Sequence, residues 1–386
     1  MQEVETILAL LGVAAALTVV ARRLEVPYPI VMTVGGLAIG FIPYVPRVAL
    51  PPDIVFLAVL PPILFAAAYS MSPRDLRMYA RPIALLAIGL VLATTLVVGV
   101  VVHTLEPGIG WAAAFALGAI VSPPDAVAAT SIARRLGIPR RAVAILEGES
   151  LVNDATALVA LRLAVAAAAT GTFSLADAAG SFLVVSVGGV AIGVVVGWLL
   201  VQLLRRLDDP PVEVLVSLLG PFAAWIPAEA LHVSGVLSVV TAGLLLGRAA
   251  ARVMSSDTRV LGSGVWQMVI FILHGLVFVL IGLQLPAILD SLRADRTIGE
   301  LVTLAVAVSL AVILVRLVWV FPGTYLPRWL SAGIREREPS PSPRVVLIVG
   351  WAGMRGVVSL AAALALPLSV EGGAPFPGRD LLLFLT

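Results

Sequence analysis

Long apolar stretches separated by short polar loops fill the whole chain. A helix that crosses the hydrocarbon core of a bilayer needs about 20 mostly apolar residues. The pattern therefore predicts an all-α polytopic membrane protein with about thirteen transmembrane helices, of which the second and third are short for a full crossing. The predicted spans cover residues 4–21, 28–43, 53–70, 82–104, 110–131, 144–169, 179–204, 212–230, 233–251, 264–286, 299–322, 344–368 and 377 onward.

The arginines divide the predicted loops into two sets. Eighteen arginines lie in the odd-numbered loops, four lie in the even-numbered loops, and three lie inside spans. Since basic residues gather in cytoplasmic loops, we expect a cell (inner) membrane protein with its N-terminus outside and its C-terminus in the cytoplasm. The acidic start of the chain favours a retained first span over a cleaved signal peptide. The last apolar run is still open at Thr386, so we also expect that a polar tail is missing.

Composition narrows the class of protein. Hydrophobic residues make up 60% of the 386 and charged residues only 12%, whereas soluble domains contain about 25% charged residues. This chain could not cover a globule with polar surface, which excludes a soluble enzyme and a nucleic-acid binder. The absence of cysteine excludes disulfides and thiolate metal sites. All 25 basic residues are arginines, so no intramembrane lysine is available.

Charged residues inside spans are costly, at about 2.5–3.5 kcal/mol each on insertion scales, and they mark functional sites. The fifth span contains Pro123, Pro124 and Asp125 in its middle. Two prolines remove two backbone donors, so the helix is expected to open around Ser122–Asp125. Free carbonyls at this depth are tolerated only where they line an enclosed cavity. The carbonyl of Ser122 or Pro123, together with the Asp125 carboxylate, would suit a dehydrated cation.

The sixth span carries two polar faces. At 100° per residue, Ser150 and Asp154 share one face of the helix, and Glu149 and Asn153 share another. The first face offers a hydroxyl and a carboxylate to an ion. The second face offers a carboxylate and an amide to a neighbouring helix, and we therefore predict a structural role for it.

The twelfth span contains Arg355 between Gly353 and Gly356, so this helix is also expected to be locally irregular. A buried arginine needs an anionic partner, and the prediction is that Arg355 pairs with Glu149. Arg162 and Arg316 are expected to lie near an interface and to extend their guanidinium groups to water.

The fifth and twelfth spans are seven apart. Thirteen spans divide into six, a linker and six, which makes these two spans the fifth member of each half. Because the offset is odd, the halves would be inverted, and matched interrupted helices in inverted repeats indicate a transporter site at the midplane. Internal sequence similarity does not support the repeat further, so it is inferred from the span order.

Four motifs together resemble a known family. They are Leu-Pro-Pro-Ile-Leu-Phe at 60–65, Asp-Ala-Val-Ala at 125–128, Gly-Glu-Ser-Leu-Val-Asn-Asp at 148–154 and Gly-Met-Arg-Gly at 353–356. In this order they resemble the monovalent cation:proton antiporters of the NhaP and eukaryotic sodium/hydrogen exchanger kind. The resemblance implies a homodimer with an elevator-like motion. It also implies a dimerisation part at approximately 1–70 and 212–286, a core part at approximately 82–169 and 299–386, and a linker helix at approximately 179–204.

The resemblance also assigns roles to residues. It implies that Asp154 binds the ion and the proton, that Ser150 and Asp125 are further Na⁺ ligands or supports, and that Asn153, Glu149 and Arg355 form a bracing network. The family usually has proline where this chain has Ala126, often Thr or Val at Pro124, and in many members an acid at Ala66. These departures leave the preference among Na⁺, Li⁺ and K⁺ open.

The resulting hypothesis is antiport of Na⁺ (or Li⁺) against H⁺ by alternating access, without an enzymatic activity or a cofactor. Burial and the charge of Asp125 disfavour a bare carboxylate at Asp154, so a proton and a cation compete for it. Electrogenic relatives carry two aspartates and a lysine, and here Asn153 takes the first position, so we expect electroneutral one-for-one exchange. The main alternative is K⁺/H⁺ antiport. A cation channel and an intramembrane aspartyl protease are remote alternatives, the latter because its Gly-x-Gly-Asp and Pro-Ala-Leu elements are absent.

Overall fold

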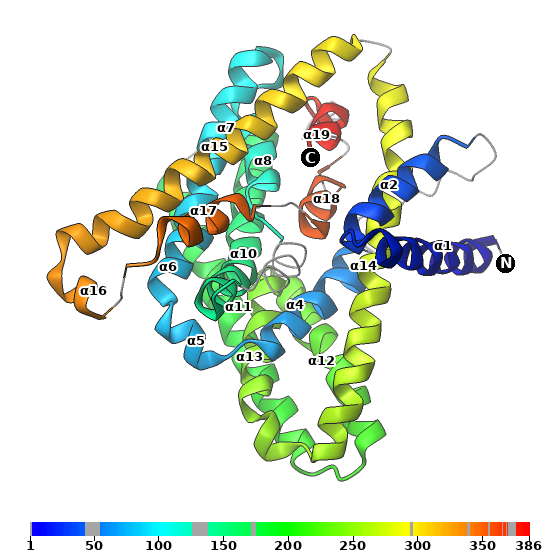
Figure 1. Cartoon of the computed structure of the whole chain (residues 1–386), viewed down its shortest axis with the longest axis vertical. Helices are drawn as coiled ribbons and strands as arrows, with labels where there is room; N and C mark the ends of the chain where they lie inside the picture. Colours follow the sequence, from blue (N-terminus) through cyan, green and yellow to red (C-terminus); the bar gives the residue numbers. More distant parts are fainter. Residues whose placement is uncertain are drawn as a thin grey trace. The chain divides into compact units, whose positions relative to one another are not determined.

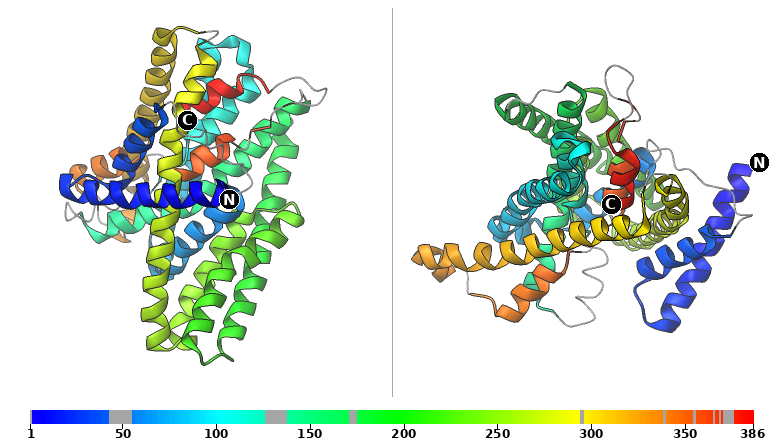
Figure 2. Two further views of the ribbon diagram at one scale, coloured as in Figure 1. Left: turned by 90° about the vertical axis from the view of Figure 1, so that its right-hand side faces the viewer. Right: turned by 90° about the horizontal axis from the view of Figure 1, so that it is seen from above.

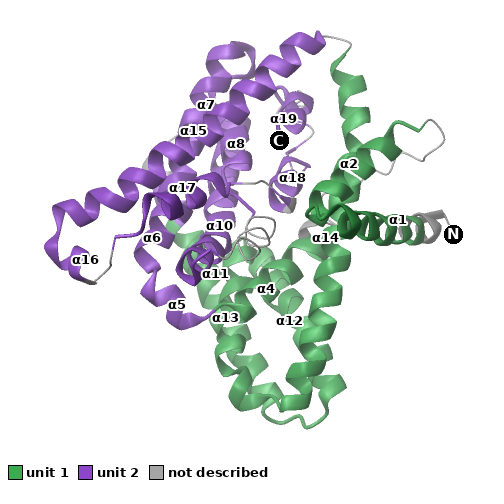
Figure 3. Ribbon diagram, viewed as in Figure 1, with its two compact units in different colours: residues 1–71, 183–294 green, residues 72–182, 295–386 purple. Residues whose placement is uncertain are grey.

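A computed structural model shows an all-helical chain (Figure 1). It describes residues 2–42, 55–125, 138–170, 175–293, 296–337, 340–353, 356–364, 366–367, 369 and 376–386. The chain forms two compact units (Figure 3), one of Met1–Met71 and Leu183–Ala294 and the other of Ser72–Phe182 and Asp295–Thr386. We call them unit 1 and unit 2.

Unit 1 contains the first helices and the middle of the chain. Its helices are α1 (Gln2–Leu24), α2 (Tyr28–Gly40), the π-helical turn η1 (Val55–Val59), α4 (Leu60–Ser70), α12 (Pro210–Ala230), α13 (Gly235–Val253), α14 (Ser256–Leu292) and most of α11 (Leu175–Leu204). α2 packs tightly on α14. The approach is so close at Gly36 that a Cβ atom there would overlap the carbonyl oxygen of Val279. Small residues allow such close approach of helices in membranes, where burial from water adds little.

Unit 2 contains the two predicted interrupted spans. Its elements are α5 (Pro73–Met78), α6 (Ala80–Ala84), η2 (Leu85–Leu90), α7 (Val91–Leu105), η3 (Pro107–Ile109), α8 (Trp111–Val121), α10 (Arg140–Thr170), α15 (Ile298–Leu330), α16 (Ala332–Arg337), α17 (Pro343–Trp351), α18 (Val357–Leu364) and α19 (Arg379–Leu385). α7 and α8 run side by side, as the two further views of Figure 2 also show. Gly118 of α8 lies directly against the carbonyl group of Thr95 in α7.

Seven of the described helices are long and apolar enough to cross a membrane. They cover Ala80–Leu105, Arg140–Ala169, Ala179–Leu204, Pro210–Ala230, Gly235–Val253, Ser256–Leu292 and Ile298–Leu330. Three shorter apolar helices accompany them, at Tyr28–Gly40, Leu57–Ser70 and Trp111–Val121. The chain is therefore a multi-pass membrane protein, and the count of about thirteen spans stays a prediction.

Both predicted interruptions are present in the described residues. α8 ends at Val121, directly before Ser122, and no helix covers Pro123 to Asp125. The twelfth apolar run divides into α17, which ends at Trp351, and α18, which begins at Val357. The prediction of an opened fifth span is confirmed, and its cause is the missing backbone donors of the two prolines.

An apolar cluster joins η2, α10, α15 and α17 within unit 2. Its buried members are Leu86, Leu90, Ala142, Leu146, Val320, Val346 and Val349. The cluster packs the first half of the interrupted span, α17, against the helix that carries the Glu149–Asp154 motif. The part of α10 directly before the polar motif is thus held in this apolar cluster through Ala142 and Leu146.

Candidate functional site

α10 is a continuous helix through the motif at residues 148–154, so the predicted helical faces are present. Glu149, Asn153 and Asp154 are all buried, with 1%, 0% and 5% of their surface exposed, and Ser150 is half-buried. Ser150 and Asp154 are four residues apart and share one side of the helix. Three buried polar side chains in six residues require specific partners, because unsatisfied polar groups are costly in an apolar interior.

Asn153 fixes the open end of α8. Its side-chain Nδ2 donates a hydrogen bond to the backbone carbonyl of Pro124 across 3.1 Å, and this bond is buried. The Ser122 hydroxyl donates to the carbonyl of Ala119 across 2.9 Å, so this side chain caps its own helix. The Oδ1 atom of Asn153 is buried and has no hydrogen-bond partner within the described ranges.

The two interruptions meet at Asp125 and Gly356. A Cβ atom at Gly356 would overlap the carboxylate of Asp125, so only glycine leaves room for this side chain. Asp125 is also close enough to Asp154 for the two carboxylates to interact electrostatically. The opened end of α8 and the start of α18 therefore come together beside α10.

Glu149 forms a buried ion pair with Arg316, a partner that the sequence did not suggest. Both guanidinium NH groups of Arg316 donate to the two carboxylate oxygens of Glu149, one of them across 2.9 Å. Arg316 also donates to the carbonyl of Val349 from Nε and from Nη2, across 3.2 and 3.1 Å. This carbonyl belongs to the last turn of α17, where backbone acceptors lack helical partners and a cation is favourable. Arg355 lies outside the described residues.

The prediction that Arg316 extends to an interface is wrong. Its side chain is buried, with 2% of the residue exposed. The apolar run was predicted to end at Pro322, which placed Arg316 near the end of a span, but α15 continues through Pro322 and Pro327 to Leu330. Arg316 is thus near the middle of a long helix, and a charge at that depth needs a partner. Arg162 is exposed on α10, and its position at an interface stays a prediction.

The sequence analysis missed the structural role of Arg316 and the buried hydroxyl of Ser359. One sequence feature could have indicated that Arg316 is buried and paired. It is the single charged residue between Leu301 and Phe321. Ser359 of α18 was not singled out either. Its hydroxyl is buried and has no hydrogen-bond partner in the described part of the chain, and it follows Gly356 by one helical turn. A serine in an apolar helix gives no distinctive sequence signal.

With this geometry in view, comparison with known proteins identifies the family. The family described as "Sodium/hydrogen exchanger, transmembrane" matches residues 7–386. The chain belongs to this family. Its sequence is 34% identical over 390 residues to a "Sodium, potassium, lithium and rubidium/H(+) antiporter" of Bacillus pumilus, covering 98% of this chain and 58% of the relative. It is 32% identical to the Na(+)/H(+) antiporter ApNhaP of Aphanothece halophytica, covering 94% of this chain and 67% of the relative.

The fold also matches a solved structure. The sodium proton antiporter MjNhaP1 from Methanocaldococcus jannaschii superposes with a TM-score of 0.79 at 19% identity, covering 100% of this chain and 92% of that protein. This likeness establishes the antiporter fold. The chain spans a little over half, 58%, of the length of the Bacillus relatives that it matches.

Proposed function

We propose that the chain exchanges Na⁺, or Li⁺, for H⁺ across the cell membrane, with Asp154 as the shared binding group. The observation that carries this proposal is the difference between two buried acids on α10. Glu149 is neutralised by Arg316, whereas the Asp154 carboxylate has neither a hydrogen bond nor an ion pair among the described residues. A bare carboxylate in an apolar interior is costly. A proton or a metal cation would each relieve this cost, and the two compete for the same oxygens.

Further ligands for the cation are proposed from the same region. The Asp125 carboxylate interacts electrostatically with Asp154, and Ser150 shares its helical face. The backbone carbonyl of Ser122 or Pro123 is the proposed ligand from the opened segment, where no helix follows Val121 in the described residues up to Asp125. Oxygen ligands of this kind are what a hard cation requires.

The exchange is proposed to be electroneutral, one cation per proton, because a single carboxylate changes its occupant. Loaded forms carry less charge than the empty form, so only they cross by alternating access. Unit 2 holds the proposed site and serves as the moving core, and unit 1 serves as the dimerisation part of a homodimer. The division of the chain into these units supports this assignment. The N-terminus is placed outside the cell and the C-terminus in the cytoplasm, following the arginine distribution.

K⁺/H⁺ exchange is the second candidate. The names of the relatives from Bacillus pumilus and Bacillus subtilis include potassium and rubidium beside sodium and lithium. The ion test therefore compares all of these cations.

The test uses the purified chain in liposomes with an internal pH gradient reported by a quenched dye. Addition of Na⁺, Li⁺ or K⁺ should restore fluorescence for the parent protein, and Asp154→Asn should abolish the response. Asp208→Asn is the matched control, because Asp208 is exposed in the loop before α12. Exchange that survives in Asp154→Asn contradicts the proposal. A response that follows an imposed membrane potential contradicts the one-for-one stoichiometry.

A further inference from the structure

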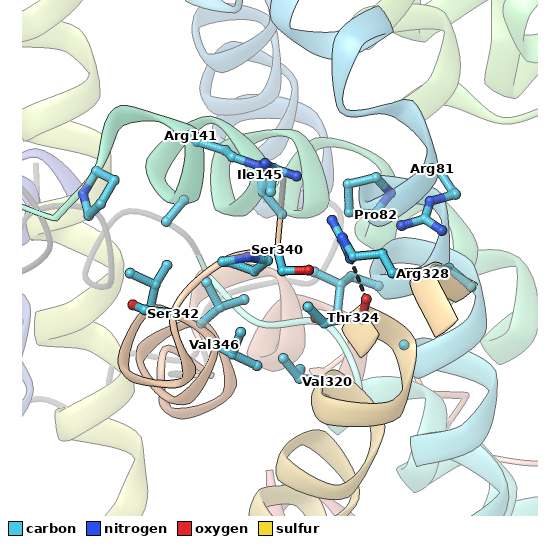
Figure 4. A pocket seen from close by; sticks show the side chains of 18 of the residues that line it. Arg81, Pro82, Arg141, Ile145, Val320, Thr324, Arg328, Ser340, Ser342 and Val346 are labelled. Carbon is cyan, nitrogen blue, oxygen red and sulfur yellow. Dashed lines mark hydrogen bonds between the residues drawn. The ribbon is translucent and has the colours of Figure 1, made fainter. Parts of the chain in front are cut away.

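A cavity in unit 2 has none of the buried carboxylates of α10 in its lining. Its volume is about 330 Å³, at the lower end of the range of about 300–1,000 Å³ for ligand pockets. The ends of α6, α10 and α15 and the segment before α17 surround it (Figure 4). Three arginines line it, Arg81, Arg141 and Arg328, each from a different helix. None of the lining residues that the structure describes is acidic.

The arginines are held in place around this cavity. Arg328 is 5% exposed, and its Nη1 donates to the carbonyl of Thr324 one turn earlier in α15. Arg141 lies over the ring of Tyr79, with its guanidinium carbon 5.5 Å from the ring centre. Figure 4 shows Arg81 and Arg328 close together at one side of the cavity and Arg141 along α10. Three guanidinium groups around one cavity offer several donors to a phosphate, which arginine binds in a bidentate fashion.

Most of the other residues that line the cavity are apolar. They include Leu85, Leu86, Trp319, Val320, Val345 and Val346. The residues directly before α10 and α17, Pro139 and Ser342, also line the cavity. The positive ends of these helices add to the attraction for an anion. An apolar wall beside a cationic cluster favours a ligand that carries both a phosphate and a hydrocarbon part.

The positions of the three arginines in the predicted loops indicate from which side of the membrane such a ligand would come. Arg81, Arg141 and Arg328 belong to predicted loops three, five and eleven, which the arginine distribution assigns to the cytoplasmic side. Trp329, next to Arg328, is 76% exposed, and exposed tryptophan is typical of the membrane interface. The cytoplasmic leaflet is rich in anionic lipids.

We propose that this cavity binds the phosphate-bearing headgroup of an anionic phospholipid from the cytoplasmic leaflet. The three guanidinium groups bind the phosphate, and the apolar wall covers the adjoining glycerol and the first carbons of the acyl chains. The cavity also reaches Val349, whose carbonyl accepts the hydrogen bonds of Arg316. A bound headgroup therefore stabilises α17, the first half of the interrupted span.

The test measures lipid binding directly and does not depend on transport. The full chain is delipidated in detergent, phosphatidylglycerol or phosphatidylcholine is added, and bound lipid is counted by native mass spectrometry beside the thermal unfolding temperature. Phosphatidylglycerol should bind and stabilise the parent protein more than phosphatidylcholine does. Arg81→Gln and Arg141→Gln should each weaken phosphatidylglycerol binding about five-fold, the effect of one arginine near a charged lipid surface.

Arg252→Gln is the matched control, since it removes one exposed arginine from unit 1 and should leave binding unchanged. Equal phosphatidylglycerol binding by Arg81→Gln, Arg141→Gln and Arg252→Gln would overturn the proposal. Equal binding of the two lipids by the parent protein would also overturn it. Stabilisation by inorganic phosphate alone, with no effect of phosphatidylglycerol, would replace the lipid with a soluble anion and refute the inference in this form.

Discussion

Removal of Arg316 should destabilise the protein severely. Arg316→Ala leaves the Glu149 carboxylate buried at 1% exposure with no cation, and it leaves the carbonyl of Val349 without a donor. Breaking a buried ion pair by removing one partner costs about 3–5 kcal/mol, and an orphaned buried carbonyl adds about 1–3 kcal/mol. We therefore expect a loss of about 4–8 kcal/mol, which is comparable to the whole free energy of unfolding of many domains.

The assay is thermal unfolding of the purified variant in detergent, beside its yield from membranes. Arg162→Ala provides the control, because it removes an arginine of the same size from an exposed position on α10. Glu149→Gln in the Arg316→Ala background should recover part of the lost stability, since the amide carries no charge to leave unpaired. The double-mutant cycle then gives the coupling between the two side chains, expected to be above about 1 kcal/mol for residues in direct contact.

Two results would refute this reasoning. If Arg316→Ala unfolds at the same temperature as Arg162→Ala, the buried pair does not contribute to stability. If Glu149→Gln costs the same in both backgrounds, the two side chains are not coupled, and Glu149 has another partner. In that second case Arg355→Ala would be the next variant to measure.

Three further predictions follow from contacts in unit 2. Gly356→Ala should abolish exchange in the dye assay, because the new Cβ displaces the Asp125 carboxylate, whereas Gly299→Ala in open space should retain it. Asn153→Ala should lower the free energy of unfolding by about 1–3 kcal/mol in denaturant titration, because a buried carbonyl at the end of α8 loses its donor. Glu106→Gln should cost at most about 1 kcal/mol by the same measurement, since its ion pair with an arginine is partly exposed.

The interrupted helices could be predicted from sequence because their causes are local. Two adjacent prolines remove two backbone donors wherever they stand in a span, so the end of α8 at Val121 follows from Pro123 and Pro124 alone. The helical faces of α10 follow from the period of 3.6 residues in the same way. A single proline was less informative, because α15 continues through Pro322. Neighbouring helices and side chains satisfy the freed carbonyl in such cases.

The partner of Glu149 could not be predicted because it depends on packing between distant segments. Glu149 and Arg316 are 167 residues apart in sequence, and nothing in either span indicates the other. The sequence suggested Arg355 as the partner because a buried arginine needs an anion, and its flanking glycines indicated an irregular helix. The structure gives Gly356 a different reason to be glycine, the close approach of Asp125. A contact of this kind becomes visible only when two broken helices are placed together.

One face of α10 supports both interrupted helices of unit 2. Asn153 donates to the carbonyl of Pro124 at the open end of α8. Glu149 binds Arg316, which in turn donates to the carbonyl of Val349 in the last turn of α17. Each interruption frees backbone acceptors, and at each one a carbonyl accepts from a side chain on this face or from that side chain's ion-pair partner. The side chains of Glu149 and Asn153 on this face therefore hold the two interrupted helices in place.

The other face of α10 has the opposite property. Asp154 is buried there without an ion pair in the described residues, with the Asp125 carboxylate in electrostatic range. If the protein needed only a stable core, an apolar residue of similar volume at Asp154 would cost less than a buried acid. Asp154→Leu should therefore raise the unfolding temperature, or leave it unchanged, while it abolishes exchange. A marked loss of stability in this variant would show that Asp154 is structural, and the separation of roles between the two faces would then be wrong.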